Sequence, residues 1–167
     1  MKLNYQTLKT HHRQTRDNFP QSLSLRVHRS LSWLNRAEQE PSDHDARFIF
    51  LWVAFNAAYA NDIIDRQNFS ERKVFQNFLG RLIDSDADKL LYELVWDQFS
   101  GAIRLLIDNQ YVFQPFWDYQ NGRTTEEQWQ QAFQNSKAAA LRAMGSQDTQ
   151  KVMGIMFDRL YTLRNQL

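Results

Sequence analysis

Residues 152–167 read VMGIMFDRLYTLRNQL, and their apolar side chains recur at the spacing of one helical face. On a helical projection, Arg164 falls on the flank of this apolar stripe, near Leu160. Arg159 and Thr162 fall on the other side. The pattern therefore predicts an amphipathic helix in which Arg159 faces solvent and Arg164 edges the buried surface, where a guanidinium needs a partner. The apolar stripe consists of Val152, Met153, Met156, Phe157, Leu160, Leu163 and Leu167.

Helical spacing continues through the rest of the chain. The helices that it predicts cover residues 20–40, 42–66, 68–84, 88–108 and 124–144. The chain has only three prolines and five glycines, which favours helices over a series of short strands. The sequence therefore predicts an all-α fold, an up-and-down helical bundle with additional short helices. Residues 1–19 are predicted to form a basic arm or a short helix, and residues 20–167 a single bundle domain.

Short polar motifs mark the starts of three of these helices. Ser42 is predicted to cap the second helix, and Ser85 with Asp88 the fourth. Thr124 and Glu127 form a capping-box pattern at the start of the helix over residues 124–144. These polar side chains are expected to accept hydrogen bonds from backbone N–H groups that a helix leaves unpaired at its first turn.

Residues 48–60 are apolar on every helical face, apart from Asn56. This pattern predicts that the helix over residues 42–66 is the central and most buried one. A buried amide must be hydrogen-bonded, or it costs on the order of 1–3 kcal/mol. Asn56 therefore has two interpretations. It bonds the backbone of a neighbouring helix, or it orients Arg164 or contacts RNA.

Charge is distributed unevenly along the chain. Residues 1–36 contain seven Lys or Arg residues and one acid, Asp17. Such a basic segment steers nucleic acid, and Arg26 and Arg29 are its candidate RNA-binding residues. The alternative is a basic helix face that water solvates.

The residue types exclude several kinds of site. The absence of cysteine excludes disulfides, thiolate metal sites and a cysteine nucleophile. It also fits a reducing compartment, so we expect a cytoplasmic protein. The longest apolar run has 13 residues, whereas a membrane span needs about 20. We therefore expect no membrane association.

Two further groups of side chains have competing interpretations. The adjacent His11 and His12 suggest a metal or phosphate contact, but adjacent residues do not share a helical face, which favours a mobile arm. His28 is either a catalytic residue or a partly buried structural histidine, and its position beside an apolar helical stripe favours the structural interpretation. The aromatic residues of 109–123 form either a surface for stacking nucleobases or a plug that closes the end of the bundle. Burial of large rings favours the plug.

Two segments resemble the HEPN superfamily of small helical domains. Residues 163–167, LRNQL, resemble the start of its Arg-Asn-x-x-x-His signature. Residues 52–59, WVAFNAAY, resemble a segment of the Apea-like HEPN branch. The resemblance implies a HEPN-like helical bundle, and many members of this superfamily are metal-independent ribonucleases of toxin and defence systems.

The resemblance also implies a site. In such ribonucleases an arginine and a histidine from two protomers meet at a dimer interface, and no cofactor or metal is needed. By this resemblance, Arg164 stabilises the charge that develops on the phosphate, and Asn165 positions the motif. The implied partners are RNA, a second copy of the chain, and a cognate antitoxin or other partner protein.

The histidine of the family signature is missing from these residues. None of the four histidines follows an arginine at the family's spacing. Either the natural protein continues past Leu167 to the histidine of the signature, or it lacks this half of the family's catalytic pair. We therefore expect this chain to cleave RNA poorly or not at all.

The alternative to an RNA-directed domain is a non-catalytic helical module that dimerises or binds a partner protein. In that case Arg164 would be a structural residue, paired with an acid such as Asp62 or Asp97.

Overall fold

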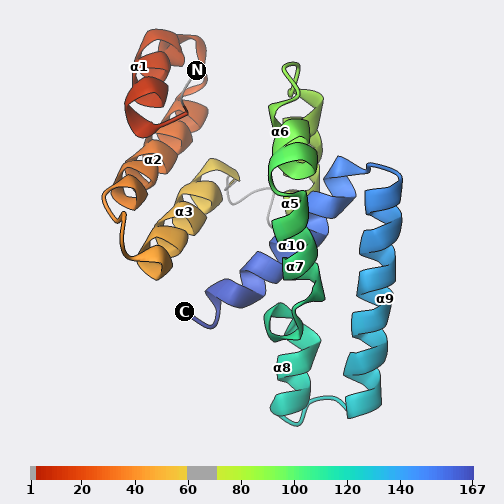
Figure 1. The fold of residues 1–167 in the computed structure, drawn as a ribbon. Helices are drawn as coiled ribbons and strands as arrows, with labels where there is room; N and C mark the ends of the chain where they lie inside the picture. The colour runs from red at the N-terminus through yellow and green to blue at the C-terminus, as the bar shows by residue number, and fades with distance from the viewer. Residues whose placement is uncertain (1–2, 60–70) are drawn as a thin grey trace. The chain divides into compact units, whose positions relative to one another are not determined.

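A computed structural model describes residues 3–59 and 71–167 of the chain (Figure 1). All regular elements in these two ranges are helical, with no strand among them, which confirms the predicted all-α class. None of the helices described is both long enough and apolar enough to span a membrane. The HEPN-like arrangement of the bundle stays a prediction.

The chain divides into two compact units. The first comprises Met1–Phe69 together with Leu167, and the second comprises Ser70–Gln166. The predicted domain ranges, 1–19 and 20–167, do not coincide with this division and stay a prediction.

The first unit contains three α-helices and a short 3-10 turn. Helix α1 spans Tyr5–Thr15, the 3-10 turn η1 spans Arg16–Asn18, helix α2 spans Gln21–Glu38, and helix α3 spans His44–Tyr59. Helices α2 and α3 pack together along their length. The basic N-terminal residues therefore form a helix, which is one of the two forms that the sequence predicted.

Local sequence explains where these helices begin. Asn4 accepts a hydrogen bond from the backbone N–H of Thr7 at 3.0 Å and starts α1. Pro20 is the N-cap of α2, because its fixed φ suits a helix start. At α3 the side chain of Asp43, rather than Ser42, accepts from the N–H of Ala46 at 2.9 Å. The predicted cap is therefore one residue out of place.

Helix α3 is less buried than its sequence predicts. Trp52, Ala54 and Ala57 are buried, but Leu51 is 40 % exposed. Trp33 of α2 stacks on Phe50 with ring centroids 5.7 Å apart. The predicted continuation of this helix beyond Tyr59 lies outside the described residues. Among the described helices α10 has more buried residues than α3. The prediction that the helix over residues 42–66 is the most buried one stays a prediction, because residues 60–66 lie outside the described residues.

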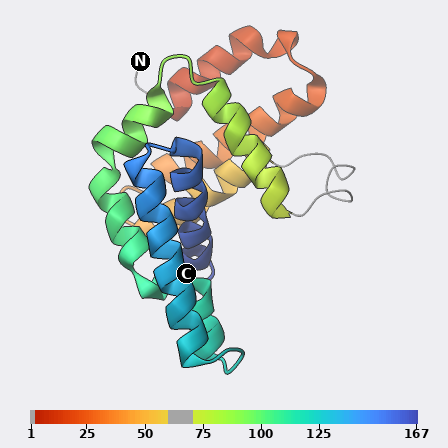
Figure 2. The ribbon, with the colours of Figure 1, turned by 90° about the vertical axis from the view of Figure 1, so that its right-hand side faces the viewer.

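The second unit is built from helices α5 to α10. Helix α5 spans Glu71–Asp84, α6 spans Leu90–Glu93, α7 spans Ser100–Asp108, α8 spans Gln114–Gln120, α9 spans Glu126–Gly145, and α10 spans Thr149–Arg164. Two short turns connect them: η2 is a π-helical turn at Leu94–Gln98, and η3 is a 3-10 turn at Gln110–Val112. Figure 2 shows α9 running beside α10.

The core of the second unit lies where α10 meets α5, α7 and α9. Its buried side chains are Leu79, Val95, Ile103, Ile107, Ala140, Ala143, Met144, Val152 and Met153. Helices α5 and α10 approach closely at Gly154, where an added Cβ atom would lie 2.8 Å from Nε2 of Gln76. A side chain at position 154 would therefore require the Gln76 side chain to move.

The predicted helix over residues 88–108 is interrupted. Both carboxylate oxygens of Asp86 accept hydrogen bonds, from the backbone N–H groups of Leu90 and Leu91 at 2.8 Å each, and this cap starts α6. The N–H of Phe99 then donates to the carbonyl of Leu94 at 2.9 Å, five residues earlier. This π-helical turn separates α6 from α7, so the prediction of one continuous helix is wrong.

The aromatic residues of 109–123 pack mainly inward, as the plug interpretation predicts. Phe116 is buried with Trp129 and Phe133 of α9. The indole N–H of Trp117 donates to the carbonyl of Tyr111 at 2.7 Å, which ties α8 back onto η3. The ring of Tyr111 differs from the others, since it remains 56 % exposed.

Candidate functional site

The Arg-Asn pair lies at the C-terminal end of α10. Arg164 is the last residue of the helix, and Asn165 is its C-cap. An Nη2 hydrogen of Arg164 is donated to Oδ1 of Asn165, at 2.6 Å. The guanidinium also lies over the ring of Tyr161, with Cζ 4.6 Å from the ring centroid. Arg164 is half-buried and Asn165 is exposed, so both side chains border solvent.

The turn η3 holds the same end of α10. Nε2 of Gln166 donates to the carbonyl of Tyr111 at 2.6 Å. That carbonyl also accepts from Trp117, so one backbone oxygen joins η3 to both α8 and α10. Two side-chain donors on one carbonyl fix the terminal turn of α10 against the aromatic segment. The Arg-Asn pair is therefore carried on an anchored helix end.

Arg159 occupies a place that the sequence analysis did not predict. Its side chain is 2 % exposed and Thr162 is 3 % exposed, so the prediction that both face solvent is wrong. Nη2 of Arg159 lies 3.1 Å from Oγ of Ser136 and 3.5 Å from the carbonyl oxygen of Ile107. The helix buries a wider sector than its apolar stripe because α5, α7, α9 and η3 all pack on it.

Aromatic rings surround the guanidinium of Arg159. Its Cζ lies 4.1 Å from the ring centroid of Phe113 and 5.4 Å from that of Phe133. Burial lowers the pKa of Arg159 to about 10, and the neighbouring Asp158 carboxylate opposes part of this shift. Arg159 is therefore still charged at neutral pH. The rings of Phe113 and Phe133 and the carbonyl of Ile107 contact its guanidinium where water would otherwise lie.

A signal for Arg159 was present in the sequence. Arg159 lies seven residues after Val152 and three before Thr162, and seven residues return a helix to nearly the same face. Val152 is fully buried. A projection that included polar residues on the buried face would therefore have identified Arg159. The apolar residues alone define a buried face that leaves out Arg159 and Thr162, although both side chains are buried.

The other candidate residues lie in the first unit. Arg26 and Arg29 are both on α2, where Arg26 is half-buried and Arg29 is exposed. Asn56 is half-buried on α3. Arg164 belongs to the second unit, so an orienting contact between Asn56 and Arg164 stays a prediction. Of the acids considered as partners for Arg164, Asp97 is exposed on η2 and Asp62 lies outside the described residues.

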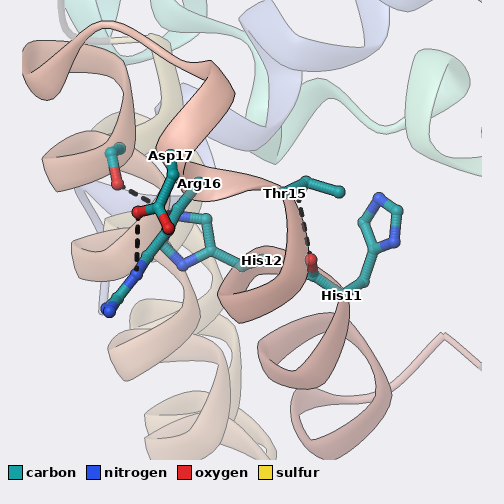
Figure 3. A network of polar contacts seen from close by, with 6 residues as sticks. His11, His12, Thr15, Arg16 and Asp17 are labelled. Carbon is teal, nitrogen blue, oxygen red and sulfur yellow. Dashed lines mark hydrogen bonds and ion pairs between the residues drawn. The ribbon is translucent and has the colours of Figure 1, made fainter.

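A second buried basic side chain lies between α1 and α2. His12 is 5 % exposed, and its Nε2 lies 3.2 Å from Oγ of Ser24. Figure 3 shows that His11 points away from His12, as expected for adjacent helical residues. Nε of Arg16 lies 3.7 Å from Oδ1 of Asp17 in the same network. Burial, followed by the positive charges of Lys9, Arg16 and His28, lowers the pKa of His12 and favours the neutral imidazole.

His28 is exposed, so its interpretation as a partly buried structural residue is wrong. Its Nδ1 lies 2.7 Å from Nζ of Lys9, which links α2 to α1 at the surface. In residues 3–59 and 71–167, no three His, Cys, Asp or Glu side chains come together as a metal site would need. The expectation that the protein uses no metal or cofactor stays a prediction.

Searches of protein-family models, of curated proteins and of solved structures return no match for this chain. The site at the end of α10 is therefore interpreted from its own geometry and from the sequence resemblance.

Proposed function

We propose that this chain is a HEPN-like RNA-binding domain in which Arg164 contacts a phosphate and Asn165 positions Arg164. The observation that carries the proposal is the hydrogen bond between these two side chains at a helix end that borders solvent. A guanidinium is planar, always charged near neutral pH, and suited to bidentate contact with phosphate oxygens. Stacking on Tyr161 limits the orientations that Arg164 samples, so less entropy is lost when phosphate binds.

The proposal extends to the class of reaction. In a toxin or defence ribonuclease of this type, the RNA 2′-hydroxyl attacks the adjacent phosphate without a metal, at an interface between two protomers. Arg164 would stabilise the negative charge of the transition state. A histidine would transfer the proton, and these 167 residues contain none at the family's spacing. We therefore expect this chain by itself to bind RNA and to cleave it weakly or not at all.

The basic N-terminal segment has a supporting role in the proposal. The exposed Arg29 and half-buried Arg26 would attract the RNA backbone through long-range charge, which raises the association rate. Binding should therefore weaken steeply as salt concentration rises. In this proposal the side-chain amide of Asn56, in the first unit, would form a hydrogen bond with RNA.

The experiment compares the wild-type chain with Arg164→Ala and with Arg104→Ala, a control at an exposed arginine on α7. Binding of a fluorescent single-stranded RNA is measured by anisotropy in EDTA. We expect Arg164→Ala to weaken binding about tenfold, which is ~1.4 kcal/mol, and Arg104→Ala to leave it unchanged. Asn165→Ala should weaken binding by less, because it leaves the positive charge in place.

Thermal unfolding of the same variants separates the two roles of Arg164. A functional Arg164 predicts that the alanine variant unfolds near the wild-type temperature. Unchanged RNA binding with a clearly lower unfolding temperature would instead make Arg164 structural and favour the partner-binding module. Strong Arg164-dependent cleavage by this chain would contradict the expectation of weak activity.

A further inference from the structure

An exposed apolar stripe runs along α6 and η2 and ends at Phe99, the residue before α7. Leu90 is 46 % exposed, Leu94 is 36 % exposed and Phe99 is 52 % exposed. Leu90 and Leu94 are four residues apart and share a helical face. Single exposed apolar residues are ordinary, but a row of three on one face is typical of an interaction surface.

The π-helical turn brings Phe99 into this row. In a regular α-helix, a residue five positions after Leu94 would lie well round the helix from it. Here the N–H of Phe99 donates to the carbonyl of Leu94 at 2.9 Å, so the two residues are one π turn apart and lie on one face. π turns are uncommon and often occur at functional sites.

The inner side of the same turn is fixed to the core. Val95 is 5 % exposed and belongs to the main core cluster. The indole N–H of Trp96 donates to Oγ1 of Thr149 at the start of α10, at 2.9 Å. These contacts hold the turn in place while its outer side faces solvent. The stripe is therefore displayed on a rigid support, which lowers the entropic cost of binding a partner.

The charged residues within the stripe are acidic, and a basic residue lies beyond each of its ends, Lys89 before Leu90 and Arg104 after Phe99. From Leu90 to Ile103 the chain contains no Lys or Arg, and its charged residues are Glu93 and Asp97. Both of these carboxylates are exposed, whereas the exposed Asp88 and Lys89 just before the stripe carry opposite charges. Glu93 and Asp97, which lie within the stripe, favour a positively charged partner.

We propose that the stripe formed by Leu90, Leu94 and Phe99 is a docking surface for a basic amphipathic helix of a partner protein. The apolar face of that helix would cover the stripe, and its Lys or Arg side chains would pair with Glu93 and Asp97. The stripe spans ten residues, so a partner helix of about three turns matches its length.

The test uses a synthetic helical peptide as the probe. The peptide has leucines at helical spacing on one face and lysines at the other positions, and a matched peptide has glutamates in place of the lysines. Binding of each labelled peptide to the full chain is measured by fluorescence anisotropy. We expect the basic peptide to bind at least tenfold more tightly than the acidic one, and added salt to weaken its binding. Equal binding of the two peptides would overturn the proposal.

Single substitutions test whether the peptide binds at the stripe. Phe99→Ser and Leu94→Ser should each weaken binding of the basic peptide at least tenfold. Leu25→Ser, at a 60 % exposed leucine on α2, should leave it unchanged. Wild-type binding by Phe99→Ser would overturn the proposal. So would a dimer of the free chain that Phe99→Ser dissociates, because the stripe would then be covered by a second copy.

A charge-reversed variant keeps the proposal testable if the serine variants fail to fold. Glu93→Lys with Asp97→Lys changes exposed side chains only. It should reverse the preference, so that the acidic peptide binds more tightly than the basic one. A charge-reversed chain that still prefers the basic peptide would overturn the charge argument.

Discussion

Arg159 in the second unit and His12 in the first are both buried basic side chains. Arg159 is protonated near neutral pH, whereas burial and nearby charges favour the neutral form of His12. Arg159 stays charged, with the rings of Phe113 and Phe133 against its guanidinium. His12 lies beside other positive charges and favours its neutral form. Burial alone therefore does not decide whether a basic group keeps its proton. The intrinsic pKa and the immediate neighbours decide it together.

The largest expected effect is at Arg159. Arg159→Ala should lower the free energy of unfolding by about 3 kcal/mol, because it removes a buried side chain that joins α7, α9 and α10. Chemical denaturation measures this change. Arg104→Ala on the surface of α7 is the matched control and should shift stability by less than about 0.5 kcal/mol. Similar losses in the two variants would mean that Arg159 contributes no more than an exposed arginine.

A double-mutant cycle sharpens the contribution of the ring. Phe113→Leu keeps an apolar side chain but removes the ring that lies 4.1 Å from the guanidinium of Arg159. Combined with Arg159→Ala, it should reveal a coupling of about 1–2 kcal/mol, as expected for a desolvated cation on an aromatic face. Additive losses would show that the two residues contribute independently and that stacking is not what keeps Arg159 buried.

The smallest expected effect is the pH dependence contributed by His12. Its pKa is lowered in the folded chain, so this contribution to stability is complete above the pKa of an unfolded histidine, about 6.5. As the pH falls from that value toward the lower pKa of His12 in the folded chain, the unfolded chain binds a proton that the folded chain does not, and the stability contributed by neutral His12 is lost. Unfolding free energy should therefore decrease between about pH 7.5 and about pH 5.5, and His12→Gln should make the decrease smaller. Denaturation curves across this range measure it, and an identical slope in both proteins would contradict the assignment.

Helix starts show how far local sequence reasoning extends. The capping box at α9 was predicted at Thr124 with Glu127, and it forms at Thr125 with Gln128 instead. The cap of α3 is Asp43 rather than Ser42. The first N–H groups of α6 donate to Asp86, three residues before the N-cap Lys89, rather than to Ser85 or Asp88. Each motif contains more than one side chain that can accept from the first turn. Local sequence therefore predicts approximately where a helix begins. Which of the neighbouring polar side chains caps it depends on how the helix packs.

The interruption at η2 has a different origin. Residues 88–108 have a helical apolar pattern without proline, so nothing local predicts a π turn. The turn accompanies the bond between Trp96 and Thr149, residues 53 positions apart in the chain. Contacts over such a distance are not encoded in helical periodicity. The alignment of Leu94 with Phe99, and with it the exposed stripe, depends on that packing.

The sequence by itself determined the all-α class, the approximate ranges of α2, α5, α9 and α10, and the Arg-Asn pair in the last residues of this sequence. These follow from apolar periodicity, from capping residues and from a short motif, all of which act over a few residues. Only the tertiary structure decided that Arg159 is buried, that Leu51 of α3 is exposed, and that a π turn displays Phe99. Those outcomes depend on which helices pack against each face, and no single helix carries that information in its own pattern.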